Sequence, residues 1–181
     1  MNEKNRRYIQ RLTLSAMLLA LGMILPFLTM QLQSIGNMLL PMHLCVMLCG
    51  LICGWRYGAL VGFILPIFRS LVFGMPPMYP TALAMAFELA AYGLTVALVY
   101  AALGRKRLWQ VYAALLSAML LGRAVWGIVT AVLLGVSGDA FTVQMFFASA
   151  FLNAIPGIVL QLVLIPAIMA LLKKMKKEID P

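Results

Sequence analysis

The stretch TALAMAFELAAYGLTVALVYAAL, residues 81–103, decides the fold class of this chain. It is long enough to cross a bilayer as a helix, which takes about 20 residues. Its one charged residue is Glu88. Backbone groups in hydrocarbon must be satisfied within a helix or a closed barrel, and the stretch lacks the strict alternation of barrel strands. We therefore interpret it as a transmembrane helix.

The rest of the chain has the same character. Of its 181 residues, 64% are hydrophobic and 10% are charged, against about half and about a quarter in a soluble domain. Apolar blocks of membrane length recur along the sequence and leave no room for a soluble domain. We predict an all-α polytopic membrane protein, a single bundle of six transmembrane helices at residues 12–30, 39–54, 57–72, 81–103, 110–134 and 141–172.

The positive charges predict how this bundle is oriented. The net charge of +9 could indicate nucleic-acid binding, but no nucleic-acid-binding motif accompanies it, and we expect no such partner. All Lys and Arg residues except Arg69 and Arg123 border apolar blocks, on connections that six spans place on one side. Because loops rich in Lys and Arg stay inside the cell, we expect a plasma-membrane protein with both termini cytoplasmic and its cations near lipid headgroups.

A second set of polar residues lies within the apolar blocks. A charge at mid-bilayer costs about 2.5–3.5 kcal/mol on insertion scales, so such residues face the bundle interior or water and usually have partners. At a rise of about 1.5 Å per residue, Glu88 lies roughly 10 Å below the outer start of its span. This bias towards the outer half predicts a substrate pocket loaded from outside, with the candidate residues Arg123, Asn153, Glu88, Trp126, Tyr79, Gln144, Arg69 and His43.

Structural roles compete with binding for several of these residues. Glu88 and Arg123 could form a static ion pair that locks two helices, a role compatible with ligand binding. His43 is interpreted first as an interfacial histidine without a function of its own, and Arg69 is close enough to the surface to snorkel. Because arginine can hold a carboxylate bidentately, Arg123 favours an acidic ligand unless Glu88 already neutralises it.

Residues that could suggest other chemistry are interpreted as packing. Cys45, Cys49 and Cys53 form one helical stripe without further zinc ligands, and the 14 Met residues are spread over all the spans. The sequence contains no G-x-x-x-x-G-K-[ST], no H-E-x-x-H and no G-x-S-x-G. We therefore expect neither an enzyme nor a bound cofactor or metal.

Small residues at intervals of four allow helices to approach closely. Two such strips are Ala16-x-x-x-Ala20 and the series Gly50, Gly54, Gly58 and Gly62. Packing within the bundle is the first interpretation of any such strip.

Taken together, these features resemble one family. The basic head, six spans in under 200 residues and the basic tail are similar to a substrate-binding S component of an energy-coupling factor (ECF) vitamin transporter. So are the segments at 16–20, 40–54 and 122–127. The resemblance implies that the chain binds a vitamin or related micronutrient from outside. Pantothenate, which carries a carboxylate, would be an example of the acidic ligand that Arg123 favours. It also implies a transmembrane coupling subunit, which Ala16 and Ala20 would face, and two cytoplasmic ATPase subunits in other chains.

Two other functions remain open. A non-transport membrane scaffold of similar six-span architecture would bind a protein partner and no small ligand. An independent small-solute carrier would move its solute without an ATPase subunit. Inverted repeats would favour a carrier, and none in this sequence is convincing.

Overall fold

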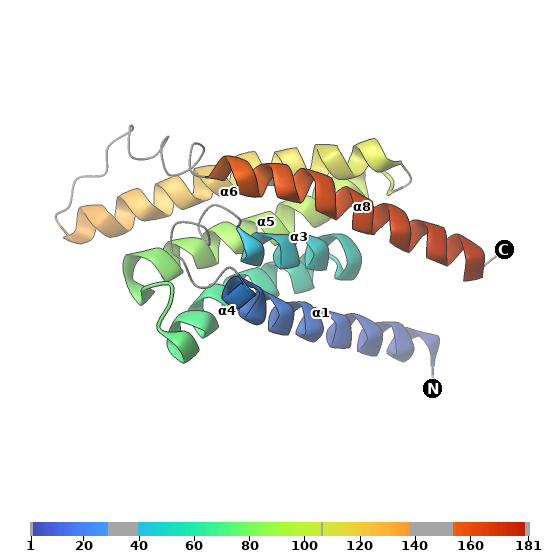
Figure 1. The fold of residues 1–181 in the computed structure, drawn as a ribbon, viewed down its shortest axis with the longest axis horizontal. Helices are drawn as coiled ribbons and strands as arrows, with labels where there is room; N and C mark the ends of the chain where they lie inside the picture. The colour runs from blue at the N-terminus through green and yellow to red at the C-terminus, as the bar shows by residue number, and fades with distance from the viewer. Residues whose placement is uncertain (1, 29–39, 106, 138–153, 180–181) are drawn as a thin grey trace.

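The computed structural model describes residues 2–28, 40–105, 107–137 and 154–179. In these ranges the chain forms α1 (Glu3–Leu28), α3 (Pro41–Cys53), α4 (Trp55–Phe73), the short turn η1 (Met78–Ala82), α5 (Leu83–Ala102), α6 (Leu108–Ser137) and α8 (Ile155–Ile179) (Figure 1). All of these helices except α3 and η1 are long and apolar enough to span a membrane. The predicted all-α membrane fold class is confirmed.

The helix α3 is shorter than the span predicted at residues 39–54. Its 13 residues rise about 20 Å, which is less than the hydrocarbon thickness of about 30 Å. Pro41 occupies the first turn, where its missing N–H costs nothing, and Gly54 ends the helix at a φ of 101°. Between them every residue except Ile52 is buried, so α3 forms the centre of the bundle.

Other helix bounds also differ from the predicted spans. The helix α1 starts at Glu3, so the basic head is itself helical and exposed. At the other end, α8 continues to Ile179, beyond the predicted stop at residue 172, and the predicted start at residue 141 lies outside the described residues. The Pro-rich stretch at 74–80 is not helical throughout, because Tyr79 has extended backbone angles.

Glycines bring α3, α4 and α5 into backbone contact. A Cβ atom added to Gly62 would overlap the carbonyl of Leu89, and one added to Gly58 would stand 2.7 Å from the Cα atom of Gly50. The glycine strip therefore packs within the bundle. Gly54 is the exception in the strip, because it forms the turn between α3 and α4 and has no atom near its Cβ position.

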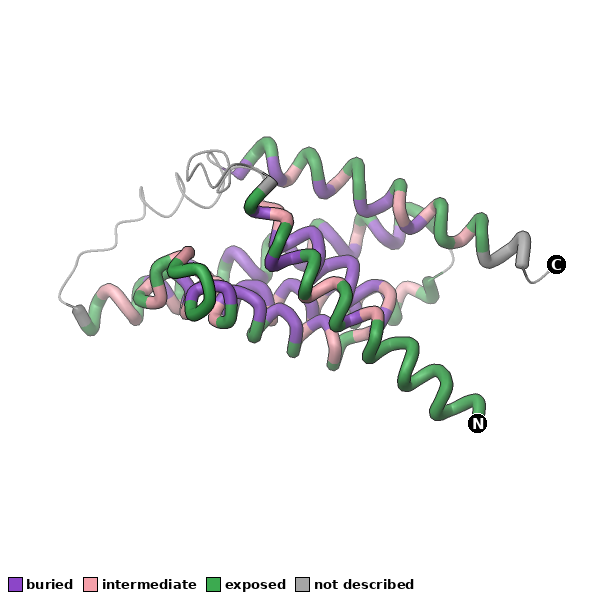
Figure 2. Tube along the Cα trace, turned by 60° about the horizontal axis from the view of Figure 1, so that its bottom comes forward, coloured by how far each residue is buried: buried purple, intermediate pink, exposed green. Residues whose placement is uncertain are grey.

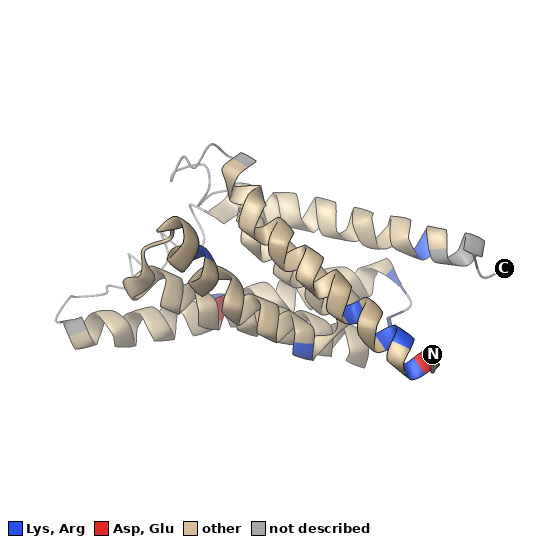
Figure 3. Ribbon diagram, turned by 90° about the horizontal axis from the view of Figure 1, so that it is seen from below, with Lys and Arg blue, Asp and Glu red and all other residues tan. Residues whose placement is uncertain are grey.

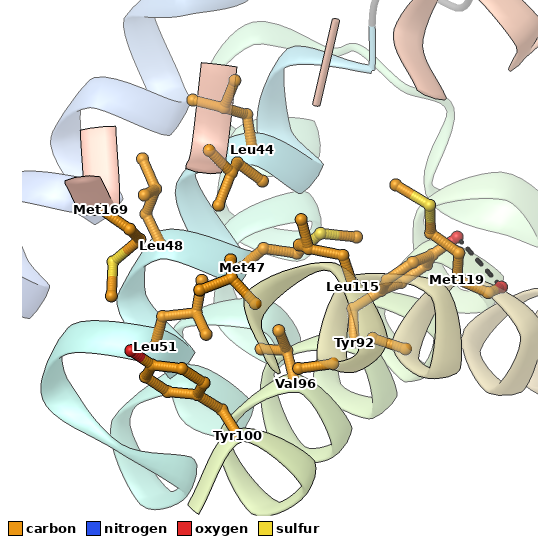
Figure 4. Close-up of a cluster of buried hydrophobic side chains, with 14 of the residues drawn as sticks. Leu44, Met47, Leu48, Leu51, Tyr92, Val96, Tyr100, Leu115, Met119 and Met169 are labelled. Carbon is orange, nitrogen blue, oxygen red and sulfur yellow. Dashed lines mark hydrogen bonds between the residues drawn. The ribbon is translucent and has the colours of Figure 1, made fainter. Parts of the chain in front are cut away.

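The buried residues concentrate in the central helices (Figure 2). Helices α1 and α8 carry many large apolar side chains that are exposed. Figure 4 shows one core cluster, in which side chains from α3, α5, α6 and α8 meet around Met47, Tyr92 and Leu115. An outward apolar surface of this extent matches a bilayer rather than water. Helix α1 begins and α8 ends at the same end of the bundle, which we call the basic end (Figure 1).

Candidate functional site

Three polar side chains from three helices converge in the bundle interior. Nη1 of Arg123 on α6 lies 2.9 Å from Oε1 of Glu88 on α5. Nε2 of His43 on α3 lies 3.5 Å from the same oxygen. The residues are 7%, 1% and 1% exposed for Arg123, Glu88 and His43. We call these three residues the polar cluster.

Tyr92 positions the three helices around the polar cluster. It follows Glu88 by one turn of α5, and its ring meets the ring of His43 edge-on, with centroids 5.1 Å apart. Its hydroxyl donates to the carbonyl of Met119 on α6 at 3.5 Å (Figure 4). Gly122 leaves room for the ring, because a Cβ there would stand 2.5 Å from Cε2 of Tyr92. The packing of one aromatic side chain thus fixes the spacing of α3, α5 and α6.

The polar cluster combines a charge pair with unused hydrogen-bonding capacity. The Glu88–Arg123 attraction is strong at this depth, since little water screens it. The paired atoms are close but not aligned as a hydrogen bond, and Nε and Nη2 of Arg123 and both ring nitrogens of His43 have no hydrogen-bond partner among the described residues. Buried polar atoms are normally hydrogen-bonded. The cluster can therefore donate to, and accept from, a polar group placed beside it.

The structure corrects the interpretation of Arg69. Its side chain is 4% exposed and does not snorkel, and the side chain of His43 is also buried within the bundle. Nη1 of Arg69 donates to the carbonyl of Met23 at 2.7 Å, and its guanidinium lies over the rings of Phe27 and Phe73 at 5.2 and 5.7 Å. These contacts satisfy the charge inside the protein, so the side chain has no need to reach the surface. Arg69 thereby ties α4 to α1.

The remaining predicted site residues are distributed as follows. Trp126 is partly buried one turn after Arg123 on α6. The hydroxyl of Tyr79, from η1, donates to the carbonyl of Leu133 near the end of α6. Asn153 and Gln144 lie outside the described residues.

Several buried polar residues were missed in the sequence analysis, among them Thr130 and Gln161. Thr130 is 7% exposed and lies two turns after Arg123 on α6, with no hydrogen-bond partner for its hydroxyl among the described residues. Gln161 on α8 is 1% exposed, and its Nε2 donates to the carbonyl of Leu40, just before α3, at 3.4 Å. Both are polar residues in membrane-length apolar blocks, which is the signal that identified Glu88.

The three cysteines are buried, unoxidised and packed into the core, as predicted. Among the described residues no group of three His, Cys, Asp or Glu side chains has the arrangement of a metal site.

The fold and the polar cluster define a polytopic helical membrane protein with a polar site inside its bundle. A family model described as "ECF transporter, substrate-specific component" matches residues 10–169. The chain belongs to this family. A search of curated proteins and a search of solved structures each found no match.

Family membership confirms the resemblance inferred from the sequence. Substrate-specific components are binding subunits of a transporter and not enzymes, so this chain is a multi-pass membrane subunit for substrate binding. It takes a small-molecule substrate and associates with the other subunits of an ECF module.

Proposed function

We propose that this chain binds a vitamin or related micronutrient at the polar cluster and takes it up from the side opposite the basic end. The convergence of His43, Glu88 and Arg123 carries this proposal. Three helices supply one residue each, and buried donors remain without partners. Trp126 and Tyr79, with Asn153 and Gln144 from the sequence analysis, complete the proposed set of ligand-binding residues.

The orientation follows from the basic end. Figure 3 shows most described Lys and Arg residues at the end of the bundle where α1 begins and α8 ends. Loops and tails rich in Lys and Arg stay in the cytoplasm. Both termini are therefore cytoplasmic in this proposal, and the substrate arrives from outside the cell.

The ion pair limits which substrates fit. A carboxylate such as that of pantothenate would have to compete with Glu88 for Arg123, because the two charges already balance each other. A neutral micronutrient meets no such competition and can use the free donors of His43 and Arg123. A zwitterionic one can balance Glu88 with its own cation while its anion pairs with Arg123. We therefore place an uncharged or zwitterionic polar group at the cluster.

Glu88→Gln separates these two substrate classes. The substitution removes the competing carboxylate and leaves Arg123 in place. An acidic substrate should then bind more tightly, whereas a neutral or zwitterionic one should lose affinity together with the charge pair. Tighter binding of the ligand that co-purifies with the wild type to Glu88→Gln than to the wild type, measured by isothermal titration in detergent, would overturn our choice.

Mass spectrometry of ligands that co-purify with the detergent-solubilised protein tests the binding site itself. The wild type should carry a small polar molecule, and Arg123→Gln should lose it. Arg107→Gln is the matched control, since it removes the same side chain from an exposed position just before α6. Equal ligand occupancy in both variants would exclude the polar cluster as the binding site.

The partner subunits are proposed to meet α1. Ala16 and Ala20 are exposed on this helix, in an outward face of apolar residues that includes Met17 and Leu21. Small residues let the coupling subunit approach closely, and that subunit links this chain to two ATPases. Ala20→Trp should abolish co-purification with these subunits but keep the substrate, whereas Ala124→Trp on the exposed face of α6 should retain both.

The two alternatives make different predictions. A scaffold would co-purify with another protein and carry no ligand. An independent carrier would move its substrate into liposomes that contain this chain alone. Neither result is expected from a binding subunit that depends on ATPases in other chains.

A further inference from the structure

The basic end contains a hollow at the opposite end of α3 from His43 of the polar cluster. It has a volume of about 280 Å³, and three arginines from three separate elements line it: Arg11 of α1, Arg56 of α4 and Arg105 of the α5–α6 connection. Trp55 and Tyr57 also line it. We call it the arginine pocket.

The three arginines form no ion pair with any acidic residue whose side chain the structure describes. Glu3 pairs with Arg7 at 3.3 Å, and Glu88 belongs to the polar cluster. The guanidinium of Arg56 lies over the ring of Trp55 at 5.2 Å, which fixes its plane but supplies no countercharge. Three like charges that line one small hollow repel each other, and an anion between them would remove this repulsion.

The arginine pocket adjoins a groove that reaches the lipid-facing surface. The groove, of about 880 Å³, shares Arg11, Arg56 and Tyr57 with the pocket. Its other lining residues are Leu60 of α4, which is 60% exposed, and the start of α1 and the residue before it: Asn2, Glu3, Lys4, Arg7 and Tyr8. The exposed side chain of Ile64 follows one turn further. Trp and Tyr residues mark the headgroup level of a bilayer, so a charged hollow at this level leads directly onto an apolar helix face.

We propose that the arginine pocket binds the phosphate of an anionic phospholipid headgroup, with an acyl chain of that lipid along Leu60. Guanidinium groups bind phosphate oxygens bidentately, and residues from three elements can surround one phosphate. A free phosphate would satisfy the same arginines but would leave the groove along Leu60 unused. One bound lipid would brace α1, the α3–α4 turn and the α5–α6 connection against each other.

Native mass spectrometry with equimolar dioleoyl phosphatidylglycerol and dioleoyl phosphatidylcholine tests this proposal. Each cation near an anionic surface contributes about 1 kcal/mol, so Arg56→Gln and Arg105→Gln should each weaken retention of phosphatidylglycerol about fivefold. Arg107→Gln is the matched control, because it removes an exposed arginine two positions from Arg105 that does not line the pocket. It should retain the lipid like the wild type.

Three results would overturn the proposal. Equal retention of the two lipids would show that the headgroup charge is not recognised. Equal losses in Arg105→Gln and Arg107→Gln would indicate diffuse attraction rather than a pocket. Displacement of phosphatidylglycerol by an equimolar amount of inorganic phosphate would show that the site takes free phosphate. All of the substituted arginines are exposed, so unchanged thermal unfolding in detergent will verify that each variant is folded.

Discussion

Removing one partner of the Glu88–Arg123 ion pair should destabilise the bundle severely. In Glu88→Met the guanidinium of Arg123 stays 7% exposed in the bundle interior and loses the carboxylate oxygen that now lies 2.9 Å away. Breaking a buried pair in this way costs about 3–5 kcal/mol, because an uncompensated charge is left in a poorly solvated place. Arg123→Met should cost a similar amount for the same reason.

The double variant is the informative member of this series. Exchange of both partners for apolar residues removes both desolvation penalties, and such exchanges are often neutral or stabilising by about 1–4 kcal/mol. Glu88→Met with Arg123→Met should therefore be more stable than either single variant. The difference between the double variant and the sum of the single variants measures the coupling of the two side chains.

The stability of each variant can be measured by titrating the ligand-free protein with sodium dodecyl sulfate in mixed micelles and following tryptophan fluorescence. Glu3 and Arg7 form the matched control, since they are also an Arg–Glu pair, at 3.3 Å, but their side chains are 86% and 74% exposed. Glu3→Met should leave the unfolding midpoint unchanged, because exposed pairs contribute little. If the double variant lost as much unfolding free energy as the two single variants together, the pairing of Glu88 and Arg123 would be refuted.

Two further predictions use the same titration. Gly62→Ala should cost about 1–3 kcal/mol, because its Cβ would overlap the carbonyl of Leu89. Gly135→Ala is the control, since Gly135 lies in open space on α6 and its substitution should not destabilise the protein. Equal losses in the two variants would contradict the close approach of α4 to α5. Tyr92→Phe should cost under about 1 kcal/mol, since the hydroxyl makes one long hydrogen bond, whereas Tyr92→Ala should cost about 3–5 kcal/mol through the cavity left beside His43. A large loss in Tyr92→Phe would mean that the hydroxyl, not the ring, positions the helices.

The fold class could be predicted because the bilayer permits few solutions. A stretch such as 81–103 has to be a helix if it crosses hydrocarbon. Hydropathy marks the part of a helix that lies in lipid and not its ends, which explains why α1 begins at Glu3 and α8 continues to Ile179. The start of α3 at Pro41 could have been predicted, because proline favours the first turn of a helix. The apolar residues on both sides of Pro41 instead suggested a longer span.

The candidate site could be predicted only in part. Glu88 and Arg123 were recognisable because a charge in the membrane is costly and needs a partner. Sequence position gives the depth of a residue along its helix but not which way its side chain faces, so neither the burial of His43 nor the aromatic cradle of Arg69 could be predicted. Thr130 and Gln161 escaped notice because a neutral polar group costs less to bury and gives a weaker signal.

The positions of the charges show that the net charge of +9 gives no information about the substrate. Most of the described cations gather at the basic end (Figure 3). In our proposals they keep this end in the cytoplasm, and three of them hold a lipid phosphate. Inside the bundle, Arg69 is engaged by a carbonyl and two aromatic rings, and Arg123 is balanced by Glu88. No described interior cation is therefore left without a partner to attract an anion. In our proposal the selectivity of this chain therefore arises from the shape and hydrogen bonds of the polar cluster, and an excess of positive charge at one end of a membrane protein does not imply an acidic ligand.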